Sequence, residues 1–345
     1  MWRSPHRATR GRVRYACRPL LDHWFPFVHL TDAGRPMPRL LAAVRSESDH
    51  VIRRPMGDAL LRMRAASPAK KVLNGRLVAW GPKARKAAQQ ATAGAFIYRP
   101  DPDDPPGVPS GDLVLCHSDA HARWHRSRGW AADRLRVVPD PVDPPPPVDR
   151  DALGLAESDF LWLLPADATR HAGRGAGLKL SVWAGALTHV LMRREGKTHR
   201  LLIPGDGRPQ RDARRFLDSL GLPDLATPPT GAPAEVLAGV ADAAVLSPTG
   251  PFDPWAVALV RAAALPTAFL PHPETNGLQV EADHVAATSS KPRHVVRAML
   301  EVIDQGKARP GTVASTGGLA TAAWRAAVSN TMPGGNVVEA ADRIQ

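Results

Sequence analysis

LLIPGDGRPQRDARRFLDSLGLPD, from Leu201 to Asp224, contains one complete unit of the fold. An apolar run of strand length leads into a Gly-Asp-Gly turn, and a stretch of helical length follows and ends at Gly221. A strand, a short glycine turn and a helix in this order form the repeating unit of a parallel sheet covered by helices. The stretch therefore predicts an α/β protein.

The same alternation continues on both sides of this unit. FLWLLP (160–165) has the length and composition of a strand, and residues 178–196 have apolar positions at helical spacing. Downstream, AAVLSP and TAFLP predict strands, and PWAVALVRAAA and residues 292–306 predict helices. Right-handed crossovers between parallel strands then give a doubly wound, Rossmann-like domain over residues 151–306.

Residues 1–143 repeat the α/β pattern in shorter and less regular form. Apolar runs such as GRLVAWGP, AFIYRP and DLVLCHS predict strands, and PRLLAAVR and KARKAAQQATAG predict helices. A proline run makes residues 144–150 a linker, because consecutive prolines fit neither a helix nor a central strand. The tail, 307–345, contains one expected helix at 318–330 that can pack back on the first domain.

Charge and cysteine usage narrow the class of protein. The net charge of +12 comes entirely from residues 1–150, which would attract phosphates, anionic lipid or nucleic acid, or simply form an arginine-rich surface. The two cysteines, Cys17 and Cys116, form no spaced motif, so we expect no metal site, and Cys116 fits a small buried residue. With neither a signal peptide nor an apolar run long enough to span a bilayer, we expect a cytoplasmic protein that can touch the inner membrane surface.

Ligands of open parallel sheets bind beyond the carboxyl ends of the strands. After the strand at 160–165, the loop PADATRHAGRGAGLK carries Arg170 and Lys179 in a glycine-rich setting. Cations and free amides near a helix start suit a pyrophosphate, although a solvated basic loop would look the same. After the next strand, Gly205 and Gly207 allow either a close approach of the backbone to a ligand or only a structural turn.

The strand AAVLSP ends in SPTGPFDP, a third candidate site. Ser247, Thr249 and the Gly250 amide can hold a phosphate beside the helix that starts near Trp255. Asp253 is the candidate catalytic acid, with the simpler alternative that it only caps this helix.

Further candidates for polar chemistry are histidines and one glutamate. His117, His121 and His125 are four residues apart and stack on one helix face, but no carboxylate follows to complete a metal site. Ser118 is expected to cap this helix. Glu274 either accepts a ribose hydroxyl or lies exposed in an Asn-Gly turn, which we favour.

The order of these segments resembles the retaining, nucleotide-sugar-dependent glycosyltransferases of family 4. DLVLCHSDAHARWHRSRGWAADRLRVVPDPVD looks like the hinge segment of that family, LLIPGDGRPQRDARRFLDSLGLPD like its strand, Gly-x-Gly and helix unit, and EVLAGVADAAVLSPTG like the following helix and strand. The resemblance implies a GT-B fold of two Rossmann-like domains, with a shortened acceptor domain first. It also implies a nucleotide diphosphate sugar as donor, bound without a prosthetic group.

The donor site departs from the family pattern. Where the family has two acids eight positions apart, this chain has Pro251 and Leu259, and Ala264 replaces the glycine that follows. Arg170 and Lys179 stand where the family has a phosphate-binding arginine and lysine, in a longer loop. Neither apolar residue can hydrogen-bond a sugar hydroxyl, and each lost bond weakens binding by about 1–3 kcal/mol.

Two functions therefore remain open at this stage. The first is transfer of a sugar to an unidentified acceptor, such as a glycan or a lipid-linked glycan, presented by the basic first domain. The second is a catalytically silent relative that binds a nucleotide, a glycan or a protein. We do not expect nucleic acid binding, because no recognition motif accompanies the basic residues.

Overall fold

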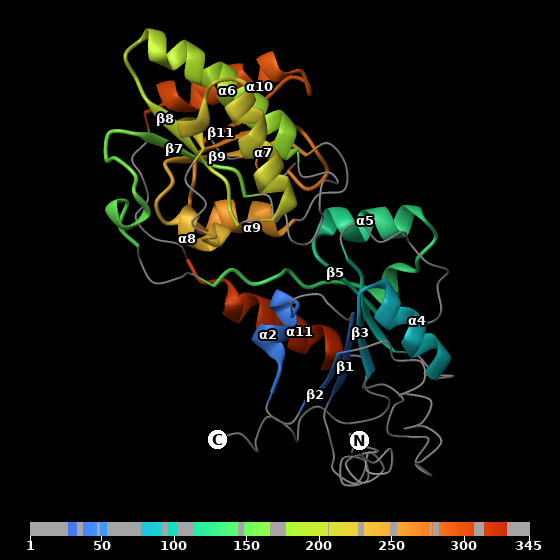
Figure 1. Ribbon diagram of the computed structural model, residues 1–345. Coiled ribbons are helices and arrows are strands. Elements are labelled where there is room, and N and C mark those ends of the chain that lie inside the picture. The colour runs from blue at the N-terminus through green and yellow to red at the C-terminus, as the bar shows by residue number, and fades with distance from the viewer. Residues whose placement is uncertain are drawn as a thin grey trace, which may run out of the picture. The chain divides into compact units, whose positions relative to one another are not determined.

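The computed structural model divides into two compact units (Figure 1). The first consists of Met1–Pro38, Arg45–Leu115 and Thr331–Gln345, and the second of Arg39–Val44 and Cys116–Asn330. The structure describes residues 27–32, 37–46, 49–53, 77–91, 96–101, 113–143, 148–165, 177–205, 207–226, 231–248, 254–275, 278, 283–306 and 314–329.

A six-stranded sheet forms in the N-terminal part of the chain, with the order β2-β1-β3-β4-β5-β6. The pairs from β2 to β5 are all parallel. Strands β1, β3, β4 and β5 are buried along their whole length, as expected for apolar runs with no alternating polar face. The strands are β1 (Val28–Thr31), β2 (His50–Arg53), β3 (Leu77–Trp80), β4 (Ile97–Arg99), β5 (Leu113–Cys116) and β6 (Leu135–Val137), and the helix between β3 and β4 is α4 (Pro82–Ala91).

The second unit contains a five-stranded parallel sheet with the order β11-β10-β9-β7-β8. Its strands are β7 (Phe160–Leu163), β8 (His199–Leu202), β9 (Ala243–Leu246), β10 (Thr267–Phe269) and β11 (His284–Ala286). The helices of this unit are α2 (Arg39–Val44), α5 (Asp119–Ser127), α6 (Leu178–Arg194), α7 (Arg208–Ser219), α8 (Ala234–Ala238), α9 (Trp255–Ala262), α10 (Pro292–Asp304) and α11 (Gly317–Ser329).

Both faces of this second sheet are buried, each in its own core. Leu161 and Leu163 of β7 pack with α8 and α9, whereas Trp162 between them packs with α6, α7 and α10 (Figure 1). Successive side chains of a strand point to opposite faces, so a continuous apolar run supplies both cores. The arrangement confirms the predicted doubly wound sheet.

Helix α6 lies unusually close to β8. A Cβ atom at Gly185, in the middle of α6, would be 2.7 Å from a Leu201 methyl carbon, so a glycine is needed for this approach unless Leu201 moves. Glycine is unfavourable inside a helix by roughly 0.5–1 kcal/mol, and close packing on the sheet explains its presence here. The contact holds the helix start, discussed below, in a fixed position against the sheet.

Helix α11, near the C-terminus, packs against α2. Its start is tied to the segment after β6, because the Thr316 amide donates to the Val142 carbonyl (3.0 Å) and the Val142 amide donates to Thr316 Oγ1 (2.8 Å). The predicted helix at 318–330 is thus present. The predicted domain limits at 143, 150 and 306 stay predictions.

The helices and strands predicted above from the sequence are present, within a few residues at their ends. Strand β11 was not predicted, because its three residues include only one buried side chain and no apolar run. Among the described residues, no helix combines the length and apolar character needed to cross a membrane.

Candidate functional site

The carboxyl ends of the strands in the second sheet lie at one edge, because β7, β8, β9 and β10 run parallel. The predicted site residues follow three of these strand ends. Lys179, Gly205, Gly207 and Ser247 lie in the described part of the chain. The remaining predicted residues, Arg170, Thr249, Gly250 and Asp253, fall outside the described residues, so their roles stay predictions.

Two of the predicted loops meet at Gly177 and Ser247. Gly177 has a left-handed backbone (φ +64°), and a Cβ atom there would lie 1.3 Å from the Ser247 carbonyl oxygen. No other residue fits, since both the backbone conformation and the contact exclude a side chain. The start of α6 therefore lies directly against the end of β9.

The Ser247 hydroxyl at this contact is buried and unsatisfied. The residue is 1% exposed, and its Oγ has no hydrogen-bond partner among the described residues. A buried hydroxyl without a partner costs about 1–3 kcal/mol, and it is rare enough in native proteins to need an explanation. A ligand that accepts or donates a hydrogen bond here would supply the missing partner.

The start of α6 is itself open to an anion. Its N-cap, Gly177, has no side chain to satisfy the first amides of a 17-residue helix. Free amides and the helix dipole favour a negative group at this end. Lys179 lies exposed in the first turn and adds a positive charge.

The glycine turn after β8 is closed by the protein itself. Gly205 has a left-handed backbone (φ +75°), and its amide donates to the Ala232 carbonyl (3.0 Å). The buried side chain of Gln210 donates through Nε2 to the Pro204 carbonyl (2.7 Å). Gly207 caps α7 with an ordinary extended backbone (φ −62°). Of the two alternatives for this turn, the contacts favour the structural one.

Of the two positions predicted to replace the family acids, Pro251 lies outside the described residues and Leu259 lies within them. Leu259 lies in α9, fully buried in the core under the sheet. Ala264 has a left-handed backbone (φ +48°), a conformation that glycine adopts more readily. Among described residues it is the one non-glycine with a positive φ.

Glu274 has a partner that the sequence did not indicate. The Ser118 hydroxyl donates to Glu274 Oε2 (2.5 Å) and also accepts from the His121 amide (3.0 Å). Ser118 is thus the predicted cap of α5. Glu274 lies in a turn, as favoured, but it is half-buried rather than exposed. The two residues are 156 positions apart, too far for local patterns to connect them.

His29 and His117, two histidines of the first half, occupy buried positions. His117 Nδ1 is 2.8 Å from Asp140 Oδ2, and both side chains are almost fully buried. His29 accepts from the Trp80 indole through Nδ1 (3.2 Å), and its Nε2 lies 3.6 Å from Asp49 Oδ2.

The carboxyl group of Asp49 also has a perturbed acidity. Burial opposes its ionisation, but hydrogen bonds from His29 and from the Ser46 amide outweigh burial and lower the pKa of Asp49. The contacts link β1, β3 and the residue before β2.

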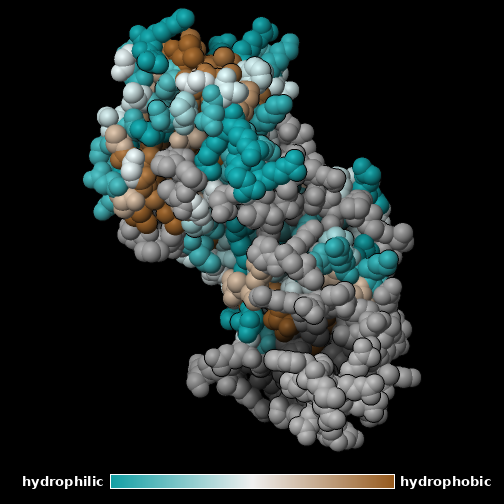
Figure 2. Space-filling view, in the orientation of Figure 1, coloured by the Kyte–Doolittle hydropathy of each residue, from teal (hydrophilic) through white to brown (hydrophobic). Residues whose placement is uncertain are grey.

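An apolar surface groove lies elsewhere, between α6 and α10. It is lined by side chains of both helices, including Leu187, Val190, Leu191, Val296 and Leu300. Figure 2 shows hydrophobic atoms at the top of the view, where Figure 1 places these helices. None of the predicted site residues lines this groove, so it does not belong to the candidate site.

Comparison with known proteins identifies the fold. No protein-family model matches the chain, and no curated protein matches it. Solved structures do match. WaaG, a glycosyltransferase involved in lipopolysaccharide biosynthesis, has a TM-score of 0.56 at 12% identity, with 92% of this chain and 100% of WaaG covered.

Two further structures extend the comparison. Anabaena Alr3699/HepE, in complex with UDP and glucose, has a TM-score of 0.57 at 16% identity, with 88% of this chain and 97% of the HepE chain covered. A putative UDP-N-acetylglucosamine 2-epimerase from Listeria monocytogenes has a TM-score of 0.55 at 11% identity, with 89% and 98% covered. The chain therefore has the predicted GT-B architecture of two Rossmann-like α/β domains, and because the fold also occurs in an epimerase, it does not by itself decide the reaction.

Proposed function

We propose that this protein binds a nucleotide diphosphate sugar and transfers its sugar, as a glycosyltransferase of GT-B fold. The observation that carries the proposal is the buried, unsatisfied Ser247 hydroxyl against the uncapped start of α6. A diphosphate fits this place, because helix amides, a hydroxyl donor and the Lys179 ammonium group all favour a multiply charged anion. The HepE structure, which contains UDP, supports testing uridine nucleotides first.

The candidate residues would act in two steps of such a reaction. The helix start, Ser247 and Lys179, together with Arg170, would bind the diphosphate and stabilise the charge that develops on it as the bond to the sugar breaks. Asp253 is the candidate to contact the sugar in place of the missing glutamates. The acceptor, a glycan or lipid-linked glycan, would bind to the basic residues 1–143, where contact with an anionic membrane surface is also proposed.

A second function is favoured by one specific observation. Leu259, at the position of the second family acid, is fully buried in the core and cannot contact a donor sugar. Removing such contacts weakens transfer much more than it weakens binding of the diphosphate, which uses other groups. The alternative is therefore a catalytically inactive homologue that still binds a nucleotide or a glycan.

Thermal unfolding in the presence of nucleotides tests the binding step. UDP, GDP, ADP and their sugars would be added to wild-type protein and to the Lys179→Ala variant. A nucleotide at 100 times its Kd stabilises by about 2.7 kcal/mol, which raises the Tm by several degrees. We expect such a rise with one nucleotide. In the Lys179→Ala variant, the same rise in Tm should need a nucleotide concentration at least about tenfold higher.

A second exposed lysine, near the opposite end of α6, provides a control for the loss of a surface charge. Lys197 is exposed just beyond the other end of α6 and pairs only with Glu195 on the surface (3.0 Å), so Lys197→Ala should leave nucleotide binding unchanged. No Tm shift with any nucleotide would overturn the proposal. A shift without release of nucleoside diphosphate from the bound sugar nucleotide, with glycan or lipid-linked acceptors present, would establish the inactive alternative.

A further inference from the structure

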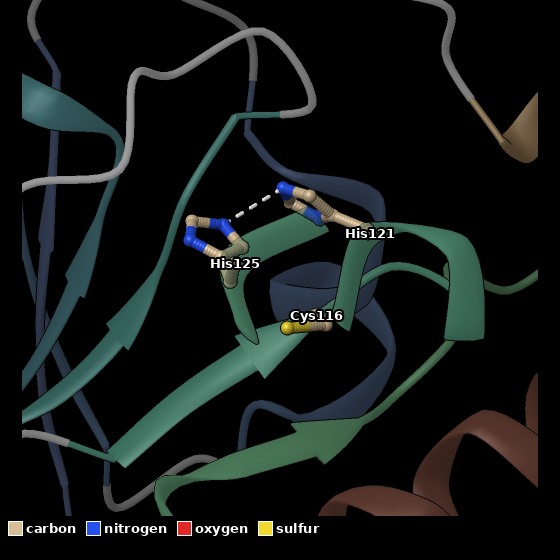
Figure 3. Close-up of side chains that lie close together, drawn as sticks. All are labelled: Cys116, His121 and His125. Atoms are coloured by element: carbon tan, nitrogen blue, oxygen red, sulfur yellow. Dashed lines mark hydrogen bonds between the residues drawn. The ribbon is translucent and has the colours of Figure 1, made fainter. Parts of the chain in front are cut away.

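Three side chains with metal-binding atoms come together where β5 meets α5 (Figure 3). Cys116 is the last residue of β5, and His121 and His125 lie one turn apart on α5. Their relative exposures are 0%, 4% and 1%. One ligand atom from each side chain lies within 4.8 Å of the others.

The local structure explains why these groups converge. The chain leaves β5 at Cys116 and enters α5 three residues later, at Asp119, with Ser118 capping the helix and accepting from the His121 amide. Residues four apart on a helix share a face, so His121 and His125 both turn toward the end of β5. Trp130 packs edge-on against the His125 ring and Trp124 packs on both rings, which limits their rotation.

The two imidazoles hold each other in an unusual contact. His121 Nε2 and His125 Nε2 are 3.0 Å apart (Figure 3). Two nitrogen lone pairs cannot face each other at this distance, so a proton must lie between them in the metal-free protein. A metal ion can replace that proton and bind both nitrogens at once.

We propose that Cys116, His121 and His125 form a binding site for a divalent transition metal of the zinc type. A thiolate and two imidazoles are ligands that zinc prefers, and buried side chains of these types are its usual protein partners. A tetrahedral zinc ion holds its ligand atoms roughly 3.3–3.6 Å apart, so the imidazoles need to separate by only a few tenths of an ångström. No fourth His, Cys, Asp or Glu joins the cluster among the described residues.

Metal binding changes the protonation of Cys116 and His121. The thiol of Cys116 loses its proton to solvent and becomes the thiolate ligand. The His117 amide donates to His121 Nδ1 (3.3 Å), so the bridging proton belongs to His121 Nε2 in the metal-free state. On binding, that proton passes to His121 Nδ1 and the weak His117 contact is lost. One proton is therefore released for each metal ion bound.

The site would act on structure rather than on the proposed sugar transfer. It joins the end of β5 to the first two turns of α5. The cap of this helix, Ser118, donates a hydrogen bond to Glu274. Ligation across this junction would stabilise the helix start by binding only the folded chain. The proposal does not depend on the identity of the nucleotide or on whether transfer takes place.

Cobalt binding to the full-length chain tests the proposal. Chelator-treated protein would be titrated with Co²⁺, which reports a thiolate ligand by a sulfur-to-metal charge-transfer band, and then with Zn²⁺. We expect about one Co²⁺ per chain, the thiolate band, its displacement by Zn²⁺ and a higher Tm with metal. Wild-type protein that takes up neither ion, or binds Co²⁺ without the thiolate band, would overturn the proposal whatever the variants do.

Variants then assign the ligands. Cys116→Ala should abolish the thiolate band, and His125→Ala should weaken Co²⁺ affinity more than about 100-fold, since even changes beyond the ligands cost roughly 10–100-fold. Cys17→Ala removes the only other cysteine and should leave the band unchanged. His189→Gln, which removes a histidine of α6 in the second unit, should do likewise. A band that persists in Cys116→Ala, or disappears in Cys17→Ala, contradicts the assignment.

Discussion

Two buried polar sites, one where the strands of the five-stranded sheet begin and one where they end, differ in how they are satisfied. Where the strands begin, Arg150 donates to Asp242 Oδ1 (2.6 Å) and to the Asp159 carbonyl (3.0 Å), and Asp242 Oδ2 accepts from the Leu161 amide (2.8 Å). Where the strands end, the buried Ser247 hydroxyl has no partner among the described residues. The Arg150–Asp242 pair is satisfied within the protein, whereas Ser247, at what we call the open edge, would need a ligand to satisfy it. The comparison is between these two places only, because Arg150 Nε and both ring nitrogens of His199, where the strands begin, also have no partner among the described residues.

This difference separates stability from binding. Substitutions in the Arg150–Asp242 pair remove contacts that exist in the folded chain, so they should lower the free energy of unfolding and leave nucleotide binding unchanged. Substitutions at the open edge remove contacts that form only with a ligand. The predictions below test whether the two edges can be separated in this way.

The largest effect is expected for Arg150→Ala. The guanidinium group is 3% exposed and holds Asp242 against the start of β7. The variant would lose these hydrogen bonds and leave Asp242, which is 19% exposed, without its partner. We therefore expect a cost of about 2–4 kcal/mol, below the roughly 3–5 kcal/mol of a fully buried pair. Urea unfolding should show this loss, while the nucleotide-induced Tm rise remains. Arg200→Ala is the control, because Arg200 is 29% exposed and its pair with Asp159 should contribute less than about 1 kcal/mol.

A large effect at the same edge is expected from acid. Burial, followed by the nearby charge of His189, lowers the pKa of His199 to about 3, from an ordinary value of 6.5. The folded protein thus holds His199 neutral, and protonation favours the unfolded chain. This contribution to stability is complete above pH 6.5 and is lost as the pH falls from 6.5 toward 3, by about 1.4 kcal/mol for each pH unit.

The His199→Phe variant isolates that contribution. Phenylalanine retains an aromatic ring against His189, whose ring is stacked on His199 at 5.4 Å, and it cannot be protonated. The difference in unfolding free energy between wild type and variant should therefore change with pH between 4 and 6.5 and be constant above about pH 7. A difference that does not vary with pH would show that His199 is already protonated or hydrated in the folded protein.

The next largest effect is expected at the open edge, where the strands end. Gly177→Ala would place a Cβ atom 1.3 Å from the Ser247 carbonyl oxygen in a left-handed backbone. We expect a loss of roughly 2–3 kcal/mol as the start of α6 moves away, together with loss of the nucleotide-induced Tm rise. Gly205→Ala is the matched control at the closed turn. It has the same left-handed backbone but its nearest contact would be 3.6 Å, so it should cost about 1–2 kcal/mol and retain binding.

The fold could be predicted from the sequence because local patterns carry it. Each buried strand is a short apolar run and each helix has its own spacing and end signals, so no distant residue is needed to recognise them. Only β11, with a single buried side chain, lacked such a signal. The edge of the sheet that carries the predicted loops also followed from the parallel topology.

The contacts that define the site could not be predicted in this way. Gly177 and Ser247 are far apart in the chain, and so are Ser118 and Glu274, and nothing in either local sequence refers to the other. Arg150 stands at the end of a proline run that predicts only a linker, although it is buried and ion-paired. The sequence argued against a metal near His121 because it offered no carboxylate, and the thiol that completes the cluster comes from a different element.

The smallest and most diagnostic change is Ser247→Ala at the open edge. Because the hydroxyl is buried without a partner, its removal should leave the free protein as stable as wild type or raise its stability by about 1 kcal/mol. The same change should weaken nucleotide binding about fivefold, the value of one lost hydrogen bond. Stability, measured by urea unfolding, and affinity, measured by nucleotide titration, would thus change in opposite directions. If both fall together, Ser247 is a structural residue with an internal partner, and the contrast between the two edges fails.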